Sequence, residues 1–186
     1  MKYKVRPARF QTSRGKYVYI QRKRKAATYQ MIEDNCQITD YGNCGKVTVY
    51  EVKEDNLKMA FCFEVENKSI FPIVIKADSG SRGEINFKVL EGEKKFTLDK
   101  TFFFQWGEKE VDDWKSLKSI AEPNTYLGIN KGKVVTCSQC FPCFKLDKLE
   151  NEEPKNLRGK PRRLLKRFAV KGELKTFRNI SSTKGS

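Results

Sequence analysis

The feature that most limits the fold of this chain is an alternation of polar and apolar side chains with a period of two, which runs from Arg14 to Leu149. Turn residues interrupt the alternation roughly every eight to twelve residues, which is typical of short strands joined by tight turns. No stretch before Glu150 has the spacing of an amphipathic helix. The pattern therefore predicts an all-β domain of about eleven or twelve strands, closed as a barrel or packed as a sandwich.

The predicted strands are short, and the alternation assigns their faces. Phe61, Phe63 and Val65 are expected on one face of their strand, with Ala60, Cys62 and Glu64 on the other. Pro72 stands at a strand start, where its missing N–H costs least. By residue number, the expected strands are 8–12, 16–23, 46–52, 58–66, 71–77, 84–90, 96–106, 114–120, 125–130, 133–138 and 143–149.

The alternation stops after Leu149, and the composition changes with it. The segment NEEPKN at residues 151–156 has the composition of a linker, and the remainder is polar and rich in Lys and Arg. We therefore expect a β domain over residues 1–150 and a basic, mostly disordered tail over 151–186. No apolar run approaches the ~18 residues of a membrane span, so we expect no membrane insertion.

The formal net charge of +15 is concentrated at the two ends of the chain. Residues 1–25 hold ten Lys and Arg and no acid, whereas residues 155–186 hold eleven against one acid. Basic clusters of this kind bind heparan sulfate or nucleic acid, or direct nuclear import, although a solvated strand end and a disordered tail have the same composition. The two clusters are Arg22, Lys23, Arg24 and Lys25 near the start, and Lys160, Arg162, Arg163, Lys166 and Arg167 in the tail.

The chain contains no His, which removes imidazole as a catalytic base and as a metal ligand. The carboxylates of Asp112 and Asp113 fall in an acidic turn, which is the usual composition of a solvated turn. A glycine-rich phosphate loop is also missing from the sequence. We predict that the protein is not an enzyme and binds no cofactor.

Cysteine spacing leaves three alternatives at Cys137, Cys140 and Cys143. Thiolates spaced as Cys-x-x-Cys bind zinc or form a redox pair, or all three are plain thiols. We expect plain thiols and no metal site, because His is absent and the Phe141-Pro142 step supplies no helix for a redox motif. The first residues lack the apolar core of a signal peptide, so we expect synthesis in the reducing cytosol, where disulfides are not the default.

A motif in the second half of the domain resembles a known family signature. Residues 117–129 read LKSIAEPNTYLGI and follow a run of aromatic residues. Ser119, Pro123 and the Tyr126-Leu127 pair stand at matching spacing. This pattern resembles the signature of the interleukin-1 superfamily of cytokines.

The resemblance covers residues 5–149 and is most specific over residues 96–149. It departs from the family at Leu117, where the family usually has Phe, and at Ile129, where Thr is common. The sequence is therefore similar to distant members, nearest to the interleukin-18 and interleukin-33 branches. The resemblance implies a β-trefoil fold of twelve strands.

The resemblance also implies a function. A protein of this family is a monomeric cytokine that binds a cell-surface receptor and a co-receptor, both built from immunoglobulin domains, in immune and inflammatory responses. Export is expected without a signal peptide, leaving a cytoplasmic and nuclear pool. Trp106 is expected to be an exposed anchor of the interface. By the same resemblance, receptor contacts are expected in the first strand and in the hairpin after the aromatic run, at Arg6, Arg9, Trp106, Glu108 and Lys109.

Two other functions fit parts of the sequence. Residues 124–135 resemble the Tyr-Leu-Gly repeat of the fibroblast growth factors, and basic ends suit heparin, but a growth factor needs a further trefoil repeat after this point. An intracellular or nuclear β-protein that binds nucleic acid would use the basic ends alone, and its affinity would fall steeply with salt. We favour the cytokine.

Overall fold

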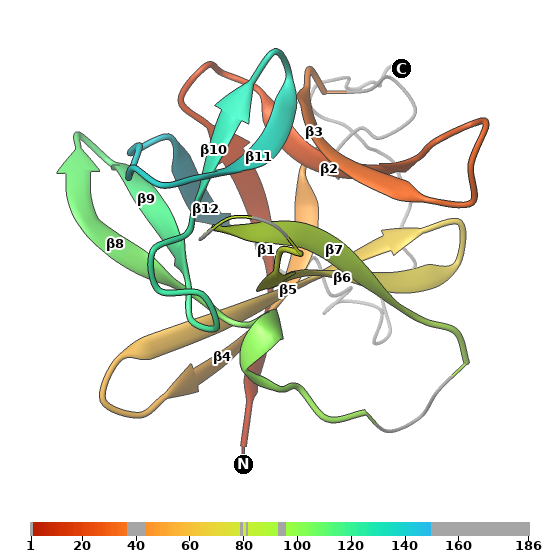
Figure 1. The fold of residues 1–186 in the computed structure, drawn as a ribbon, viewed down its shortest axis with the longest axis horizontal. Coiled ribbons are helices and arrows are strands. Elements are labelled where there is room, and N and C mark those ends of the chain that lie inside the picture. The colour runs from red at the N-terminus through yellow and green to blue at the C-terminus, as the bar shows by residue number, and fades with distance from the viewer. Residues whose placement is uncertain (1, 37–43, 79, 81, 93–95, 150–186) are drawn as a thin grey trace, which may run out of the picture. The chain divides into compact units, whose positions relative to one another are not determined.

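The computed structural model describes residues 2–36, 44–78, 80, 82–92 and 96–149, which form twelve strands and one short 3₁₀ helix (Figure 1). The all-β prediction is confirmed. Among the described residues, no helix is long and apolar enough to cross a membrane. The elements are β1 Lys4–Thr12, β2 Tyr17–Arg22, β3 Tyr29–Asp34, β4 Lys46–Lys53, β5 Leu57–Val65, β6 Lys68–Lys76, β7 Gly83–Leu90, η2 Lys100–Phe102, β8 Phe104–Val111, β9 Trp114–Ser119, β10 Tyr126–Asn130, β11 Lys133–Cys137 and β12 Phe144–Lys148.

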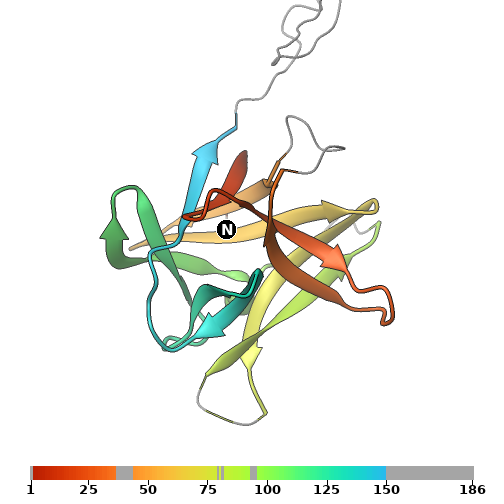
Figure 2. The same cartoon turned by 90° about the horizontal axis from the view of Figure 1, so that it is seen from above.

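Six of the strands close a barrel. They pair antiparallel around a ring in the order β1, β4, β5, β8, β9 and β12, and β12 pairs with β1 to complete the ring. The remaining strands form three hairpins, β2–β3, β6–β7 and β10–β11, around this barrel (Figures 1 and 2). A barrel of six strands with three hairpins is the β-trefoil, so the predicted fold is confirmed.

Aromatic side chains from four barrel strands fill the barrel. The ring of Phe10 in β1 lies 5.0 Å from the ring of Phe61 in β5 and 5.6 Å from that of Phe144 in β12. The Phe61 ring in turn lies 5.6 Å from that of Phe104 in β8. All four side chains are fully buried, and each such burial stabilises the fold by about 1.5–3 kcal/mol. These ring contacts join strands that lie far apart in the sequence, and they therefore stabilise the closed barrel.

The strand predicted over residues 96–106 is wrong for residues 96–103. Strand β8 begins only at Phe104, because η2 precedes it. The Asp99 carboxylate accepts a hydrogen bond from the backbone N–H of Thr101 at 2.8 Å and caps this short helix. Phe102 is then buried in a second core cluster with residues of β4, β5 and β6. Apolar residues in this segment are therefore buried without forming a strand.

Strand β3 was not predicted, because one of its polar residues is buried and the apolar residue beside it is partly exposed, which is the reverse of the usual pattern. Glu33 is buried, whereas Ile32 beside it is only half-buried. The Glu33 carboxylate accepts a hydrogen bond from the Thr12 hydroxyl at 2.9 Å, and its other oxygen lies 3.2 Å from Nε of Arg14. This buried carboxylate ties the base of the β2–β3 hairpin to the end of β1.

The residues that carry the family resemblance build the turn between β9 and β10. The backbone N–H of Ser119 donates to the Thr125 carbonyl at 2.9 Å, and the Ser119 hydroxyl accepts from the Glu122 N–H at 3.0 Å. The Thr125 hydroxyl accepts from the backbone N–H of Gly83 at 2.8 Å, across to β7. The buried serine and threonine of the motif therefore have a structural role, which is to close this turn.

Candidate functional site

The β8–β9 hairpin carries three of the predicted receptor contacts. Trp106 is paired with Leu117 in regular register, but after it the register shifts, and pairing resumes at Glu110 with Lys115. Three residues of β8 therefore face one residue of β9, Ser116. A side chain at Gly107 would overlap the buried Ser116 hydroxyl, so a larger residue fits there only if Ser116 moves. This bulge displaces Glu108 and Lys109 from the regular sheet, and both are exposed to solvent as expected.

Trp106 is not the fully exposed anchor that we expected. It lies on the same face of β8 as the fully buried Phe104, and its ring is half-buried against the main core. The ammonium group of Lys115 lies 5.5 Å from the centre of the Trp106 ring, within the range of a cation–π contact. The expectation is corrected because the alternation in β8 turns this side chain toward the barrel.

Two further aromatic residues beside this hairpin were not predicted as receptor contacts. The ring of Trp114 in β9 has the ammonium group of Lys145 at 4.7 Å, and the ring of Tyr126 in β10 has that of Lys118 at 6.0 Å. Both rings are half-buried, and Trp114 does not belong to the described core clusters. These two rings, with Lys145 and Lys118, form an aromatic face over β9, β10 and β12, on the opposite side of the sheet from Trp106, which pairs with the buried Leu117.

The two arginines predicted as receptor contacts lie in β1, away from the hairpin. Arg6 donates from Nε and Nη2 to one carboxylate oxygen of Glu51 in β4, at 3.1 and 2.9 Å. Arg9 is half-buried and lies opposite Asp147 of β12 in the sheet register. Strands β12 and β9 lie between β1 and β8 in the sheet. The predicted set is therefore divided between two parts of the described surface.

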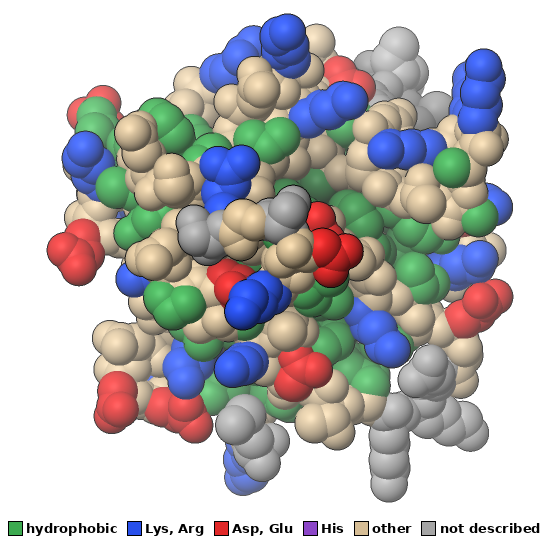
Figure 3. Space-filling model, in the orientation of Figure 1, with side chains coloured by type: hydrophobic (Ala, Val, Ile, Leu, Met, Phe, Trp, Pro, Cys, Tyr) green, Lys and Arg blue, Asp and Glu red, His purple; other side chains and the backbone are tan. Residues whose placement is uncertain are grey.

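The first basic cluster forms the tip of the β2–β3 hairpin, where all four of its side chains are exposed. The backbone N–H of Lys23 donates to the Thr28 carbonyl at 2.8 Å and closes the loop. A guanidinium nitrogen of Arg22 lies 3.5 Å from the Glu66 carboxylate. Figure 3 shows Lys and Arg side chains along this edge of the molecule. The second cluster, Lys160, Arg162, Arg163, Lys166 and Arg167, lies outside the described residues.

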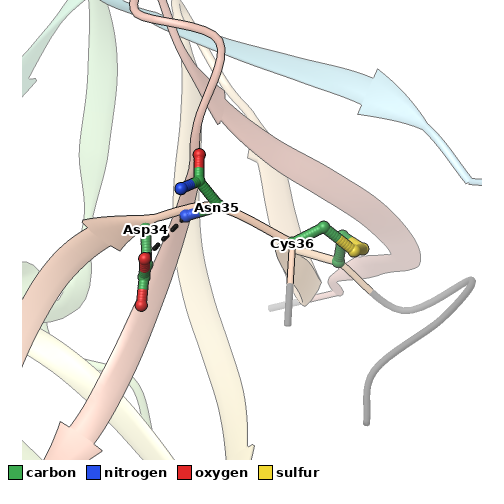
Figure 4. The surroundings of a disulfide bond; sticks show 4 residues. Asp34, Asn35 and Cys36 are labelled. Carbon is green, nitrogen blue, oxygen red and sulfur yellow. Dashed lines mark hydrogen bonds between the residues drawn. A yellow bond between two sulfur atoms is a disulfide. The ribbon is translucent and has the colours of Figure 1, made fainter. Parts of the chain in front are cut away.

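Cys36 and Cys44 form a disulfide, so the expectation of free thiols is wrong for this pair (Figure 4). Cys36 follows β3 and Cys44 precedes β4, and their Cα atoms are 5.1 Å apart, a separation that a disulfide spans readily. The backbone N–H of Asn35 donates to the Asp34 carboxylate at 2.7 Å beside the bond. Disulfides persist in oxidising compartments, mainly outside the cytosol.

The other four cysteines, Cys62, Cys137, Cys140 and Cys143, are free thiols. Burial raises the pKa of Cys62 to about 12. It also raises the pKa of Cys143 to about 12, where nearby Cys137 and Glu33 act in the same direction. Within the described ranges, no group of three or more Cys, Asp or Glu is arranged to hold a metal. Thiols that stay protonated at neutral pH, as those of Cys62 and Cys143 do, are poor nucleophiles and poor metal ligands.

Comparison with known proteins gives a structural likeness only. No family model and no curated sequence matches the chain. Among solved structures, a point mutant of Gallus interleukin-1 beta matches with a TM-score of 0.55 and 11% identity, covering 78% of this chain and 98% of that one. A hydrophobic-cavity mutant of chicken interleukin-1 matches with a TM-score of 0.54 and 12% identity, over the same shares of the two chains.

The chain has an interleukin-1-like β-trefoil fold. The strands and barrel that it shares with those cytokines run through almost the whole length of the chicken proteins. The fibroblast growth factors share the same fold, so the fold does not by itself separate the two kinds of ligand. At 11% and 12% identity the likeness shows how the chain folds. What it binds must be argued from its own surface.

Proposed function

We propose that this protein is a receptor-binding cytokine of the interleukin-1 type. It would act as a monomer and bind a cell-surface receptor and a co-receptor built from immunoglobulin domains, in immune or inflammatory responses. The observation that supports this proposal is the structural match to chicken interleukin-1 beta, which extends over 98% of that cytokine. The motif at Ser119–Leu127 supports it from the sequence side.

We place the main receptor contact on the β8–β9 hairpin and the aromatic face beside it. Affinity at protein interfaces comes from a few aromatic or Arg anchors within a polar rim, and half-exposed tryptophans are typical of such anchors. Trp106 and Trp114 provide the rings, and Glu108 and Lys109 provide exposed charge at the rim. Arg6 and Arg9 of β1 would form a second contact region.

The proposed site of action is outside the cell, after export without a signal peptide. The Cys36–Cys44 disulfide supports an extracellular location, because such bonds are stable under oxidising conditions. A cytoplasmic and nuclear pool before export remains part of the proposal. It would be measured by fractionating cells that express the full chain.

The test of the proposal is binding of the full chain to a panel of receptor ectodomains of the interleukin-1 and fibroblast growth factor types at about 0.15 M salt. We expect saturable binding to a receptor of the interleukin-1 type. The variant Trp114→Ala should weaken this binding by roughly tenfold or more, whereas Trp114→Phe, which keeps an aromatic ring, should retain most of it. Binding to growth factor receptors alone would overturn the proposal.

A further inference from the structure

The tip of the β2–β3 hairpin forms a basic hollow. Residues 22–27 and Glu66, from the turn between β5 and β6, line a space of about 370 Å³. Four of these residues in a row, Arg22 to Lys25, are basic and exposed. In Figure 1 the orange β2–β3 tip and the yellow β5–β6 turn lie on the same side of the molecule. Four cations are therefore gathered around one space large enough for a small anionic group.

The hollow is built on an anchored hairpin. The hydrogen bond between the Lys23 N–H and the Thr28 carbonyl holds the ends of the loop together. At the next position, the Tyr29 ring packs against Phe87 of β7 with their centres 6.2 Å apart, and both residues pack on the main core. The loop that carries the cations is therefore held in place before any ligand binds, which lowers the entropy cost of binding.

The charges in the hollow are only partly balanced. Glu66 pairs with Arg22 at 3.5 Å, and both side chains are about half exposed, at 60% and 46%. Lys23, Arg24 and Lys25 have no ion pair to any described residue. Like charges held this close repel one another, so a ligand carrying several negative charges would relieve the repulsion.

We propose that this hollow binds the sulfate groups of a glycosaminoglycan chain, and that Glu66 competes with sulfate for Arg22. Arginine and lysine are the side chains that pair with sulfate and phosphate groups. The lining contains no aromatic ring on which a nucleic-acid base could stack, which disfavours single-stranded nucleic acid. The disulfide at Cys36 supports an extracellular location, where sulfated glycans are the abundant polyanions.

The test compares variants of the full chain in binding a heparin hexasaccharide, measured by calorimetry over a range of salt concentrations. Because the tail is itself basic, all variants are made in a background in which Lys160, Arg162, Arg163, Lys166 and Arg167 are changed to Gln. In this background we expect Arg24→Ala/Lys25→Ala to weaken binding by roughly tenfold. The slope of log Kd against log salt should also fall by up to about two.

Two matched variants sharpen the result. Lys4→Ala/Lys53→Ala removes the same charge from exposed positions in β1 and β4, and it should change the affinity by less than about twofold. Glu66→Gln removes the competing carboxylate with little change in shape, and it should strengthen binding by roughly threefold. A loss of affinity in Glu66→Gln would contradict the proposed competition.

Other outcomes would overturn the proposal. Equal losses of glycan affinity in Lys4→Ala/Lys53→Ala and Arg24→Ala/Lys25→Ala would mean that binding depends only on the net charge of the protein. Tighter binding of an oligodeoxythymidine of equal charge, with the same dependence on Arg24 and Lys25, would make the hollow a nucleic-acid site. Binding of inorganic sulfate with no gain from the longer glycan would reduce it to an adventitious ion site. Since no receptor is present, failure here leaves the cytokine proposal standing.

Discussion

The β2–β3 and β8–β9 hairpins lie on opposite sides of the barrel in both Figure 1 and Figure 2, and they carry opposite charge. The β2–β3 tip has four bases and no acid over residues 22–25. The β8–β9 hairpin has four acids against one base over residues 107–113. Aromatic rings flank the acidic hairpin, at Trp106 and Trp114, whereas residues 23–28 of the basic tip include none.

This difference indicates two kinds of recognition in one small domain. A cluster of exposed cations attracts a polyanion at long range, and its affinity falls as salt rises. Half-buried rings act only in direct contact and are less sensitive to salt. A polyanion at the β2–β3 tip would be repelled from the acidic hairpin, which would leave the aromatic face free for a protein receptor. The two proposed ligands can therefore be tested separately.

The largest expected effect concerns the packing under the β8–β9 hairpin. Phe104 begins β8 and is fully buried against Phe61. Phe104→Ala should lower the free energy of unfolding by about 3–5 kcal/mol, because it leaves a cavity in the barrel. Urea denaturation measures the change, with Val111→Ala, which is 55% exposed at the hairpin tip, as the control. A loss below about 1 kcal/mol in Phe104→Ala would show that this hairpin is not anchored through the barrel.

A smaller loss is expected at the base of the β2–β3 hairpin. The Glu33 carboxylate is fully buried and accepts a hydrogen bond from Thr12, while its ion-pair partner Arg14 is 57% exposed. Glu33→Ala should cost about 1.5–3 kcal/mol, since it removes hydrogen bonds to a charged group. Arg14→Ala should cost less than about 1 kcal/mol, since water can replace an exposed partner. Thermal unfolding of both variants measures the difference, and equal losses would contradict this account.

Substitution of Trp106 tests separately how the acidic hairpin contributes to stability and to receptor binding. Its side chain is half-buried against the core, so Trp106→Ala should lower stability by about 1–2 kcal/mol. We also expect more than a tenfold loss of receptor affinity, which corresponds to about 1.4 kcal/mol or more. Binding and denaturation measured on the same samples separate the two effects. Retained affinity in a folded variant would remove Trp106 from the proposed contact surface.

Local patterns predicted most of the strands and much of the core. The alternation assigned Phe61 and Phe63 to one face of their strand, and both are buried, but Ala60 and Cys62 on the opposite face are buried as well. The same reasoning failed at β3, where a buried acid reverses the pattern, and before Phe104, where apolar residues are buried without forming a strand. Both failures have one cause. Burial of these residues is decided by partners distant in the sequence, such as Thr12 for Glu33.

The candidate site was predicted less completely than the fold. The basic tip is one continuous segment, so its composition alone indicated a polyanion site. Trp114 and Lys145 of the aromatic face are 31 residues apart in the sequence. They meet because β9 pairs with β12 at Lys115 and Phe144. That register depends on barrel closure. Pairing of Cys36 with Cys44 likewise depends on the approach of β3 to β4.

The smallest expected effect tests whether the basic tip contributes to stability at all. Arg24 and Lys25 are exposed and make no ion pair with any described residue. Arg24→Ala/Lys25→Ala should therefore change the free energy of unfolding by less than about 0.5 kcal/mol, or raise it slightly by relieving repulsion. Receptor affinity should also be unchanged, because the acidic hairpin lies on the other side of the barrel. Denaturation and receptor binding measure both quantities. A loss in either would mean that the two hairpins are coupled and that charge at one tip affects packing or binding at the other.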